Sequence, residues 1–279
     1  MSRLWTFGDS FTAGHGCKMF PHTTPNTTYY KKYQNYIDET KKIWPEIVAD
    51  FLGIELNNMG KNGITNEKIL DYLLLNYQKI KQDDYVIIQT STSGRYDFPF
   101  LKKKTLFGAT ADGNKELYEI NSPYRFKTIF FSNIEDEYEN INPSLLKHSN
   151  IEEDVENEEL VLTKEKYDLI RNFFLEFVYT KKHYEREIWR IVQIANNLKN
   201  VGTKVFLINE DVWPDYMEKP DFLINTTSHS LVSYVINNKN TITYDTNNQI
   251  NDNHPSYDGH INISKFIINH IENTNLHNP

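Results

Sequence analysis

The chain has 279 residues, of which 39% are hydrophobic and 14% aromatic, and its formal net charge is −8. That hydrophobic fraction predicts a folded globular protein and excludes intrinsic disorder as its general state. The negative charge argues against nucleic acid as a partner, because binding along a phosphate backbone needs clustered Lys and Arg. The single cysteine, Cys17, excludes an intrachain disulfide and a cysteine-rich zinc site, and we interpret it as a small buried residue.

The hydropathy pattern does not indicate a membrane protein. There is no uninterrupted apolar stretch of about 18 residues, the length a spanning helix needs. No export signal is visible before Gly8. We therefore expect a soluble, cytoplasmic protein with no membrane partner.

In chain order, the first predicted element is a short buried strand over residues 3–7, which leads into a Gly-Asp-Ser turn. Apolar residues at helical spacing then predict a helix over residues 43–52, with Pro45 in its first turn and Gly53 at its end. A second strand is expected over residues 54–57. A glycine-containing loop, Asn58 to Gly63, follows it.

The next segment repeats this strand and helix alternation and then loses it. The spacing predicts a helix over residues 66–80 and a buried strand over residues 85–89. From residue 98 the pattern breaks down, and we interpret residues 99–162 as an inserted lid or flap. The acidic run at residues 152–159 is interpreted as a solvated surface, because its spacing is not that of metal ligands.

The alternation resumes in the last part of the chain. Helices are expected over residues 164–177, 183–198, 231–236 and 260–271, and strands over residues 204–209 and 241–244. Alternating strands and helices predict an α/β fold, here a flavodoxin-like three-layer α/β/α domain with a central parallel sheet of five strands. We expect one domain over residues 1–279 that carries the insertion. Such sheets place their sites at the carboxyl ends of the strands.

Three residues with the chemistry of an activated serine fall at these predicted strand ends. A serine hydroxyl is a poor nucleophile until an imidazole accepts its proton, and the imidazole needs an acceptor that orients it. Ser10 follows the first strand, and Asp252 and His254 follow the last. The sequence therefore predicts that Ser10 and His254 meet at one edge of the sheet.

The motifs around these residues resemble those of the SGNH, or GDSL-type, hydrolases. The segment from Phe7 to Gly14 is similar to the family's first block, which carries the nucleophile. The Asn-x-Gly-x-x-Gly loop from Asn58 to Gly63 is similar to the second block, and residues 252–260 are similar to the last. The resemblance covers residues 4–94 and 204–271 and leaves the insertion unexplained.

The resemblance implies a role for each matching residue. Ser10 would attack an ester carbonyl, His254 would be the general base, and Asp252 would orient it. Backbone N–H groups of Ser10 and Gly63 would bind the oxyanion. The family's third block supplies an Asn as a further oxyanion donor, but this chain has no Asn there, so the donor stays open among four residues that follow the third strand: Thr90, Ser91, Thr92 and Arg95.

Several neighbouring residues are further candidates. Many family members place the acid three residues before the histidine, where this chain has Asn251, so a backbone carbonyl is an alternative partner to Asp252 for His254. We list three candidates for substrate binding: Asp9, Asn62 and Trp213. His260 is interpreted as a capping or packing residue, and His15 and His22 as surface loop residues.

Together these features predict a serine ester hydrolase that works through an acyl-enzyme. Its expected substrate is an O-acyl ester of a small molecule or glycan, such as an O-acetylated carbohydrate. The alternatives are a non-catalytic binding or structural protein that retains the fold, and an acyltransferase. No phosphate-binding loop, dinucleotide motif or His-Glu-x-x-His is present, so no cofactor or metal is expected.

Overall fold

The computed structural model describes residues 2–18, 37–91, 95–101, 124–130, 181–210, 213, 217–224, 231 and 254–277. The chain divides into two compact units. The first unit comprises Met1–Ser93 and Glu176–Pro279, and the second comprises Gly94–Leu175. The predicted helices over residues 164–177 and 231–236 and the predicted strand over residues 241–244 lie wholly or almost wholly outside the described residues.

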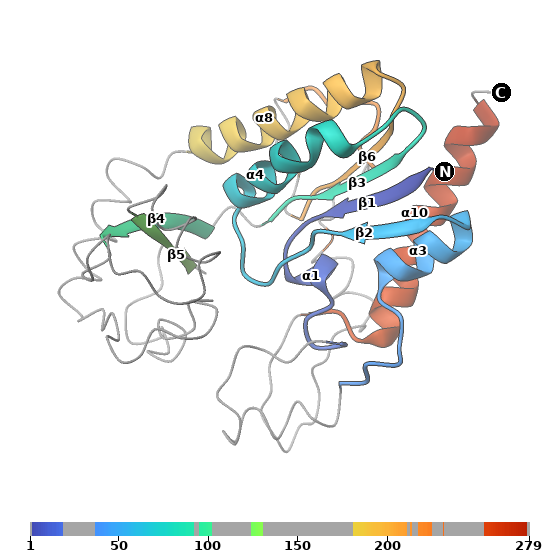
Figure 1. Cartoon of the computed structure of the whole chain (residues 1–279), viewed down its shortest axis with the longest axis horizontal. Coiled ribbons are helices and arrows are strands. Elements are labelled where there is room, and N and C mark those ends of the chain that lie inside the picture. The colour runs from blue at the N-terminus through green and yellow to red at the C-terminus, as the bar shows by residue number, and fades with distance from the viewer. Residues whose placement is uncertain are drawn as a thin grey trace, which may run out of the picture. The chain divides into compact units, whose positions relative to one another are not determined.

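The first unit contains a parallel sheet of four strands in the order β2-β1-β3-β6, as Figure 1 shows. Its strands are β1 (Arg3–Phe7), β2 (Glu55–Asn58), β3 (Tyr85–Gln89) and β6 (Lys204–Ile208). The register aligns Leu4 of β1 with Leu56 and Tyr85, and Tyr85 with Lys204. A mixed α/β fold with a parallel sheet is therefore confirmed with four strands, while the expected fifth strand falls outside the described residues.

Helices cover both faces of this sheet (Figure 1). On one face lie α4 (Asn66–Asn76), which continues into the short 3₁₀ helix η1 (Tyr77–Lys79), and α8 (Lys181–Asn200). On the other lie α3 (Trp44–Leu52) and α10 (Tyr257–His277). The result is three layers.

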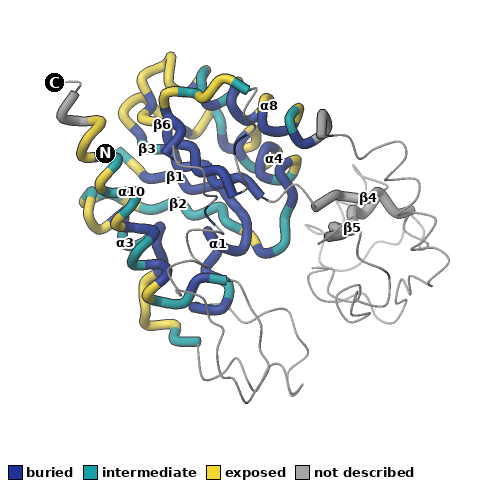
Figure 2. Tube along the Cα trace, turned by 180° about the vertical axis from the view of Figure 1, so that it is seen from behind, coloured by how far each residue is buried: buried dark blue, intermediate teal, exposed yellow. Residues whose placement is uncertain are grey.

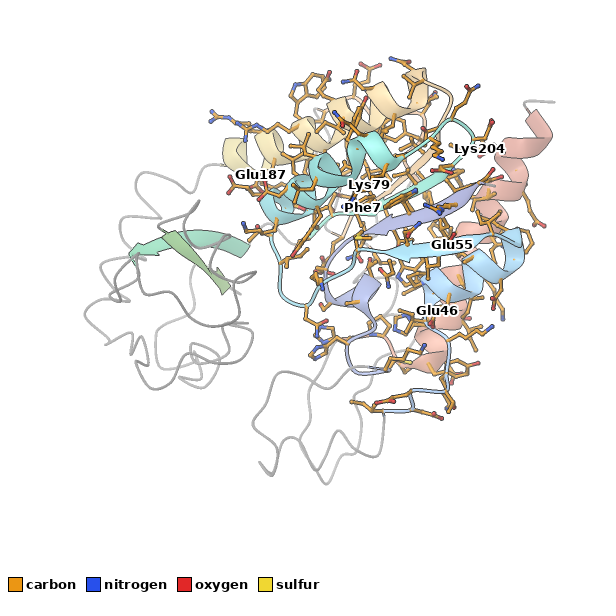
Figure 3. The ribbon with its side chains drawn as sticks, viewed as in Figure 1. Phe7, Glu46, Glu55, Lys79, Glu187 and Lys204 are labelled. Atoms are coloured by element: carbon orange, nitrogen blue, oxygen red, sulfur yellow. The ribbon has the colours of Figure 1, made fainter. Side chains whose placement is uncertain are left out.

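Side chains of each strand alternate between these two faces, because successive residues of a strand point in opposite directions. In β1, Leu4 packs toward α3 and α10, whereas Trp5 and Phe7 pack toward α4 and α8. Figure 2 shows β1, β3 and β6 as buried along most of their length and β2 as intermediate, and Figure 3 labels Phe7 on the face that α4 covers. Strands buried on both faces carry near-continuous apolar runs, and for that reason the sequence predicts them well.

The predicted helix over residues 43–52 is confirmed, with its signals as expected. The Glu46 carboxylate accepts from the backbone N–H of Ile43 at 2.9 Å, and Pro45 lies in the first turn. Gly53 ends the helix in the left-handed conformation, with φ 65°.

The last helix begins at Tyr257, earlier than predicted, because Ser256 caps it. The hydroxyl of Ser256 accepts from the N–H of Gly259 at 3.2 Å.

The second unit contains an antiparallel pair of strands, β4 (Arg95–Leu101) and β5 (Tyr124–Phe130). Neither strand is predicted from the sequence. Pro99 lies within β4, and a proline inside an apolar run argues against a strand because it lacks the N–H that a sheet requires. Whether this unit acts as a lid stays a prediction.

The order of the strands determines where loops meet. After β1 the chain forms α3 and then β2, which pairs with one side of β1. It then forms α4 and β3, and β3 pairs with the other side of β1. The carboxyl end of β1 is therefore the point at which the sheet's winding reverses. Open α/β sheets form their binding crevices at such points.

Candidate active site

Ser10 lies directly after β1, at this reversal point. It is the first residue of α1 (Ser10–Ala13), and the Asp9 carboxylate caps that turn by accepting from the N–H of Phe11 at 3.1 Å. Gly14 ends the turn with φ 85° and donates to the carbonyl of Ser10 at 3.0 Å. The tight turn holds Ser10, and only 2% of this residue's surface is exposed.

Asp9, which we predicted to bind substrate, is fully buried and holds the turn in place. Its Oδ1 accepts from Nε2 of Gln89 at 2.8 Å, and its Oδ2 accepts from the hydroxyl of Ser91 at 3.3 Å. Gln89 also accepts from the hydroxyl of Thr12 at 2.5 Å. These bonds connect the turn that carries Ser10 to the end of β3. Substrate contact by Asp9 stays a prediction.

The loop after β2 packs directly against the backbone of α1. The amide Nδ2 of Asn58 donates to the carbonyl of Thr12 at 3.1 Å, and the N–H of Lys61 donates to the carbonyl of Gly8 at 3.0 Å. A Cβ added at Gly60 would lie 2.7 Å from the backbone N of Ala13, so only glycine permits this approach. The first two sequence motifs therefore form one contiguous structure.

The second loop also contains the predicted residues Asn62 and Gly63. Asn62 is buried, and Gly63 is half-buried with φ 68°. Neither the N–H of Ser10 nor that of Gly63 has a hydrogen-bond partner within the described part of the chain. The role of both N–H groups as oxyanion donors stays a prediction.

The segment after β3 is held by side chains from two other elements. The amide of Asn66, at the start of α4, accepts from the N–H of Ser91 at 2.7 Å and donates to its carbonyl at 3.0 Å. The hydroxyl of Thr90 donates to Oδ1 of Asn209 at 2.7 Å. Of the open oxyanion candidates, Thr90 and Ser91 are buried here, whereas Thr92 and the side chain of Arg95 lie outside the described residues.

His254 comes from the other end of the chain and meets Ser10. Its Nε2 lies 2.9 Å from Oγ of Ser10, a contact between residues 244 positions apart in sequence. Its ring also contacts those of Phe11 and His15, with centroids 5.5 Å and 4.1 Å away. Because Nε2 faces the serine, Nδ1 is the nitrogen that an orienting acceptor would contact. Asp252, the predicted acceptor, lies outside the described residues.

No family model and no curated protein matches this sequence. Among solved structures, the chain is similar to that of a candidate lipolytic protein of the G-D-S-L family from Desulfitobacterium hafniense DCB-2. The two share 11% identity, the match covers 96% of this chain and 98% of that one, and the TM-score is 0.33. A similarity at this TM-score establishes neither a shared fold nor a shared activity.

Trp213, another predicted substrate-binding residue, belongs to the core beside α4 and α8. It is 5% exposed, and its indole Nε1 donates to the carbonyl of Met217 at 3.1 Å. This packing accounts for its position. Contact with substrate stays a prediction.

His260 is a buried packing residue, as its position near the start of the last helix suggested. Its Nδ1 accepts from the backbone N–H of Trp44 at 3.4 Å, an arrangement that requires the neutral ring. Burial, with a smaller contribution from the charge of His254, lowers its pKa to about 3. A permanently neutral, buried imidazole is not available as the base.

Cys17 is buried, in agreement with our interpretation of the sequence. Burial raises the pKa of its thiol to about 11, against the opposing effect of Lys41 and Lys18. A thiol with this pKa is almost entirely protonated near neutral pH and is a poor nucleophile. Cys17 is therefore not a second candidate nucleophile.

The sequence did not predict two features of this region: the ring contact between His15 and His254, and the hydrogen bonds made by the side chains of Gln89, Asn66 and Asn209. The interpretation of His15 as a surface loop residue differs from its half-buried position against His254. Gln89, Asn66 and Asn209 carry no motif of their own. The one signal that was present is that Gln89 and Asn66 stand where a predicted strand ends and a predicted helix begins.

Among the described residues, no helix is both long and apolar enough to cross a bilayer. Within the same part of the chain, no group of three or more His, Cys, Asp or Glu side chains is arranged to hold a metal ion.

Proposed function

We propose that this protein hydrolyses esters, with Ser10 as the nucleophile and His254 as the general base. The observation that supports this proposal above all is the 2.9 Å contact between Oγ of Ser10 and Nε2 of His254. That distance lies within the range over which an imidazole accepts a hydroxyl proton. The buried turn that presents Ser10 adds support, because a nucleophile must be held still to attack.

In the proposed reaction, Oγ of Ser10 bonds to the ester carbonyl carbon while its proton passes to Nε2 of His254. The carbonyl becomes an oxyanion. His254 then returns the proton to the leaving alcohol, the ester bond breaks, and an acyl group remains on Ser10. Water then bonds to the acyl carbon while its proton passes to the same imidazole. The bond between the acyl carbon and Oγ breaks, the acid leaves, and His254 returns the proton to Oγ of Ser10. Asp252 is proposed to accept from Nδ1 of His254 and to stabilise the imidazolium.

The oxyanion is proposed to accept hydrogen bonds from the backbone N–H groups of Ser10 and Gly63. Preorganised donors stabilise charge that develops only in the transition state, and the loss of one typically costs about 10²-fold in turnover. A third donor is proposed among the residues after β3, with Thr92 and Arg95 as the candidates. We propose Asp9, Asn62 and Trp213 as residues that shape the substrate site.

The proposed substrate is an O-acyl ester of a small molecule or glycan, with an O-acetylated carbohydrate as the first choice. The chain's many aromatic residues support a ring-bearing polar substrate, because aromatic faces pack against sugar rings. No cofactor takes part in the proposed chemistry, and the proposed location is the cytoplasm.

The test is a reaction of the purified full chain with p-nitrophenyl acetate and, separately, with a fluorophosphonate probe. We expect hydrolysis of the ester and labelling at Ser10, identified by mass spectrometry of the peptides. Ser10→Ala should abolish both. Ser264→Ala is the matched control, because its hydroxyl donates within its own helix to the carbonyl of Ile261 at 2.7 Å.

The same experiment separates the alternatives. A wild-type chain that neither hydrolyses the ester nor is labelled would overturn the proposal and favour a non-catalytic binding protein. Labelling at Ser10 with acyl transfer to an added sugar alcohol, in place of hydrolysis, would instead identify an acyltransferase.

A further inference from the structure

The ring of His15 lies against the ring of His254. The two ring centroids are 4.1 Å apart, and the ring planes meet at 35°. The backbone N–H of His15 donates to the carbonyl of Ser10 at 3.0 Å, so the backbone that carries this ring is bonded directly to Ser10. Phe11, in the same turn, places its ring 5.5 Å from that of His254 at 40°. Two rings from the nucleophile turn therefore contact the proposed base.

These contacts matter because the bond to Ser10 does not by itself define the orientation of the imidazole. The torsion that rotates a histidine ring about its Cβ–Cγ bond has a broad energy profile. The 2.9 Å bond to Ser10 restrains only one atom, Nε2. Neighbouring rings restrain the plane, and aromatic contacts at these separations are favourable beyond the area they bury.

The two neighbouring rings differ in their surroundings. Phe11 is 4% exposed and belongs to the core beside α3 and α10, so its position is dictated by packing. His15 is half-buried and follows the end of the turn. Its ring is therefore the neighbour of His254 that can be changed with the smaller effect on the core.

We propose that His15 is a positioning residue that holds the plane of the His254 ring against Ser10. This inference rests on the proposed function and deepens it, because it adds a second positioning residue for the base, beside Asp252. His15 acts through its flat ring and transfers no proton itself, since Nε2 of His254 already faces the hydroxyl.

The test compares His15→Ala with His15→Phe in the full chain, using p-nitrophenyl acetate. Loss of the ring should lower kcat about tenfold and leave KM within twofold, because alignment affects the reacting step and not binding. The phenyl ring should restore kcat to within about threefold of wild type. His270→Ala is the matched control, because His270 is a histidine of α10 whose ring contacts Phe206 of β6.

A second measurement keeps the result interpretable if His15→Ala is poorly folded. The rate at which fluorophosphonate labels Ser10 is measured per folded molecule, judged by circular dichroism, and His15→Asn provides another ring-free variant. Both ring-free variants should be labelled about tenfold more slowly than wild type.

The outcomes separate the two proposals. Three results would overturn the role of His15 and leave the proposed function intact. They are an equal kcat in wild type and His15→Ala, an equal loss of kcat in His15→Ala and His15→Phe, and a change confined to KM. A wild-type chain that is inert toward both the ester and the fluorophosphonate would overturn both proposals.

Discussion

The two ends of the parallel sheet each bury a carboxylate, and they use it differently. At the amino end, Asp84 accepts from the N–H of Arg3 at 2.8 Å, from the indole of Trp5 at 3.0 Å and from the N–H of Lys81 at 2.9 Å. At the carboxyl end, Asp9 accepts from Phe11, Gln89 and Ser91.

The donors explain the difference. Those of Asp84 belong to β1 and to the turn just before β3, so its bonds hold the strands themselves together. Those of Asp9 belong mainly to the segments around Ser10 and after β3, so its bonds hold the candidate active site. The same arrangement, a buried carboxylate with several donors, holds the strands together at one end and holds the turn that carries Ser10 at the other.

The largest expected effect is at the carboxyl end. His254→Ala should lower kcat/KM for p-nitrophenyl acetate by about 10⁴-fold or more, because the hydroxyl of Ser10 would lose its proposed proton acceptor. The thermal midpoint should change by only a few degrees, since His254 is partly exposed. A loss of activity in proportion to a loss of folded protein would contradict the prediction, because His254 would then stabilise the fold as Asp84 does.

Asp84→Ala should show the reverse behaviour at the amino end. Removing the carboxylate leaves three donors unpaired, and we expect a loss of about 3 kcal/mol in the free energy of unfolding. Activity per folded molecule should be unchanged. Asp71→Ala is the matched control: its exposed ion pair with Lys68, at 3.3 Å, should contribute less than about 1 kcal/mol. Urea titrations of both variants provide the measurement.

A smaller effect is expected from pH, through His260. Its pKa is lowered to about 3 in the folded chain, whereas an unfolded histidine titrates near 6.5. Below pH 6.5 the unfolded chain binds a proton that the folded chain does not, so stability falls as pH falls toward 3, by up to ~1.4 kcal/mol per pH unit.

His260→Gln should remove this part of the pH dependence, as measured by urea midpoints at pH 7, 6 and 5. His270→Gln is the control, because burial also lowers the pKa of His270, but this residue is only half-buried. An unchanged slope in His260→Gln would show that the folded chain already accepts the proton at this residue.

The smallest effect concerns Cys17. Burial raises the pKa of its thiol to about 11, so iodoacetamide at pH 8 should modify the native chain very slowly and the urea-unfolded chain rapidly. The modified fraction is read by mass spectrometry over time. Rapid labelling of the native chain would mean that the segment around Cys17, which follows the turn that carries Ser10, opens readily. That result would contradict a rigid structure at the carboxyl end of the sheet.

Local pattern was sufficient for much of the fold. The strands β1, β3 and β6 were predictable because a strand buried on both faces needs a continuous apolar run. The helix α3 was predictable from its spacing together with Pro45 and Gly53. By contrast, β4 was not predictable, because it contains Pro99 and a proline lacks the N–H that a strand donates to its neighbour.

For the candidate site, the sequence by itself determined which reactive residue types follow predicted strands: Ser10 after the first, the glycine loop after the second, and His254 near the end. Such motifs depend only on neighbours within about ten positions. The order of strands also led us to expect that Ser10 and His254 meet, but the tertiary structure alone decided that they lie 2.9 Å apart and that His15 lies against His254. The physical reason is that contacts across 244 positions follow from the order of strands and the packing of helices, which no local pattern encodes.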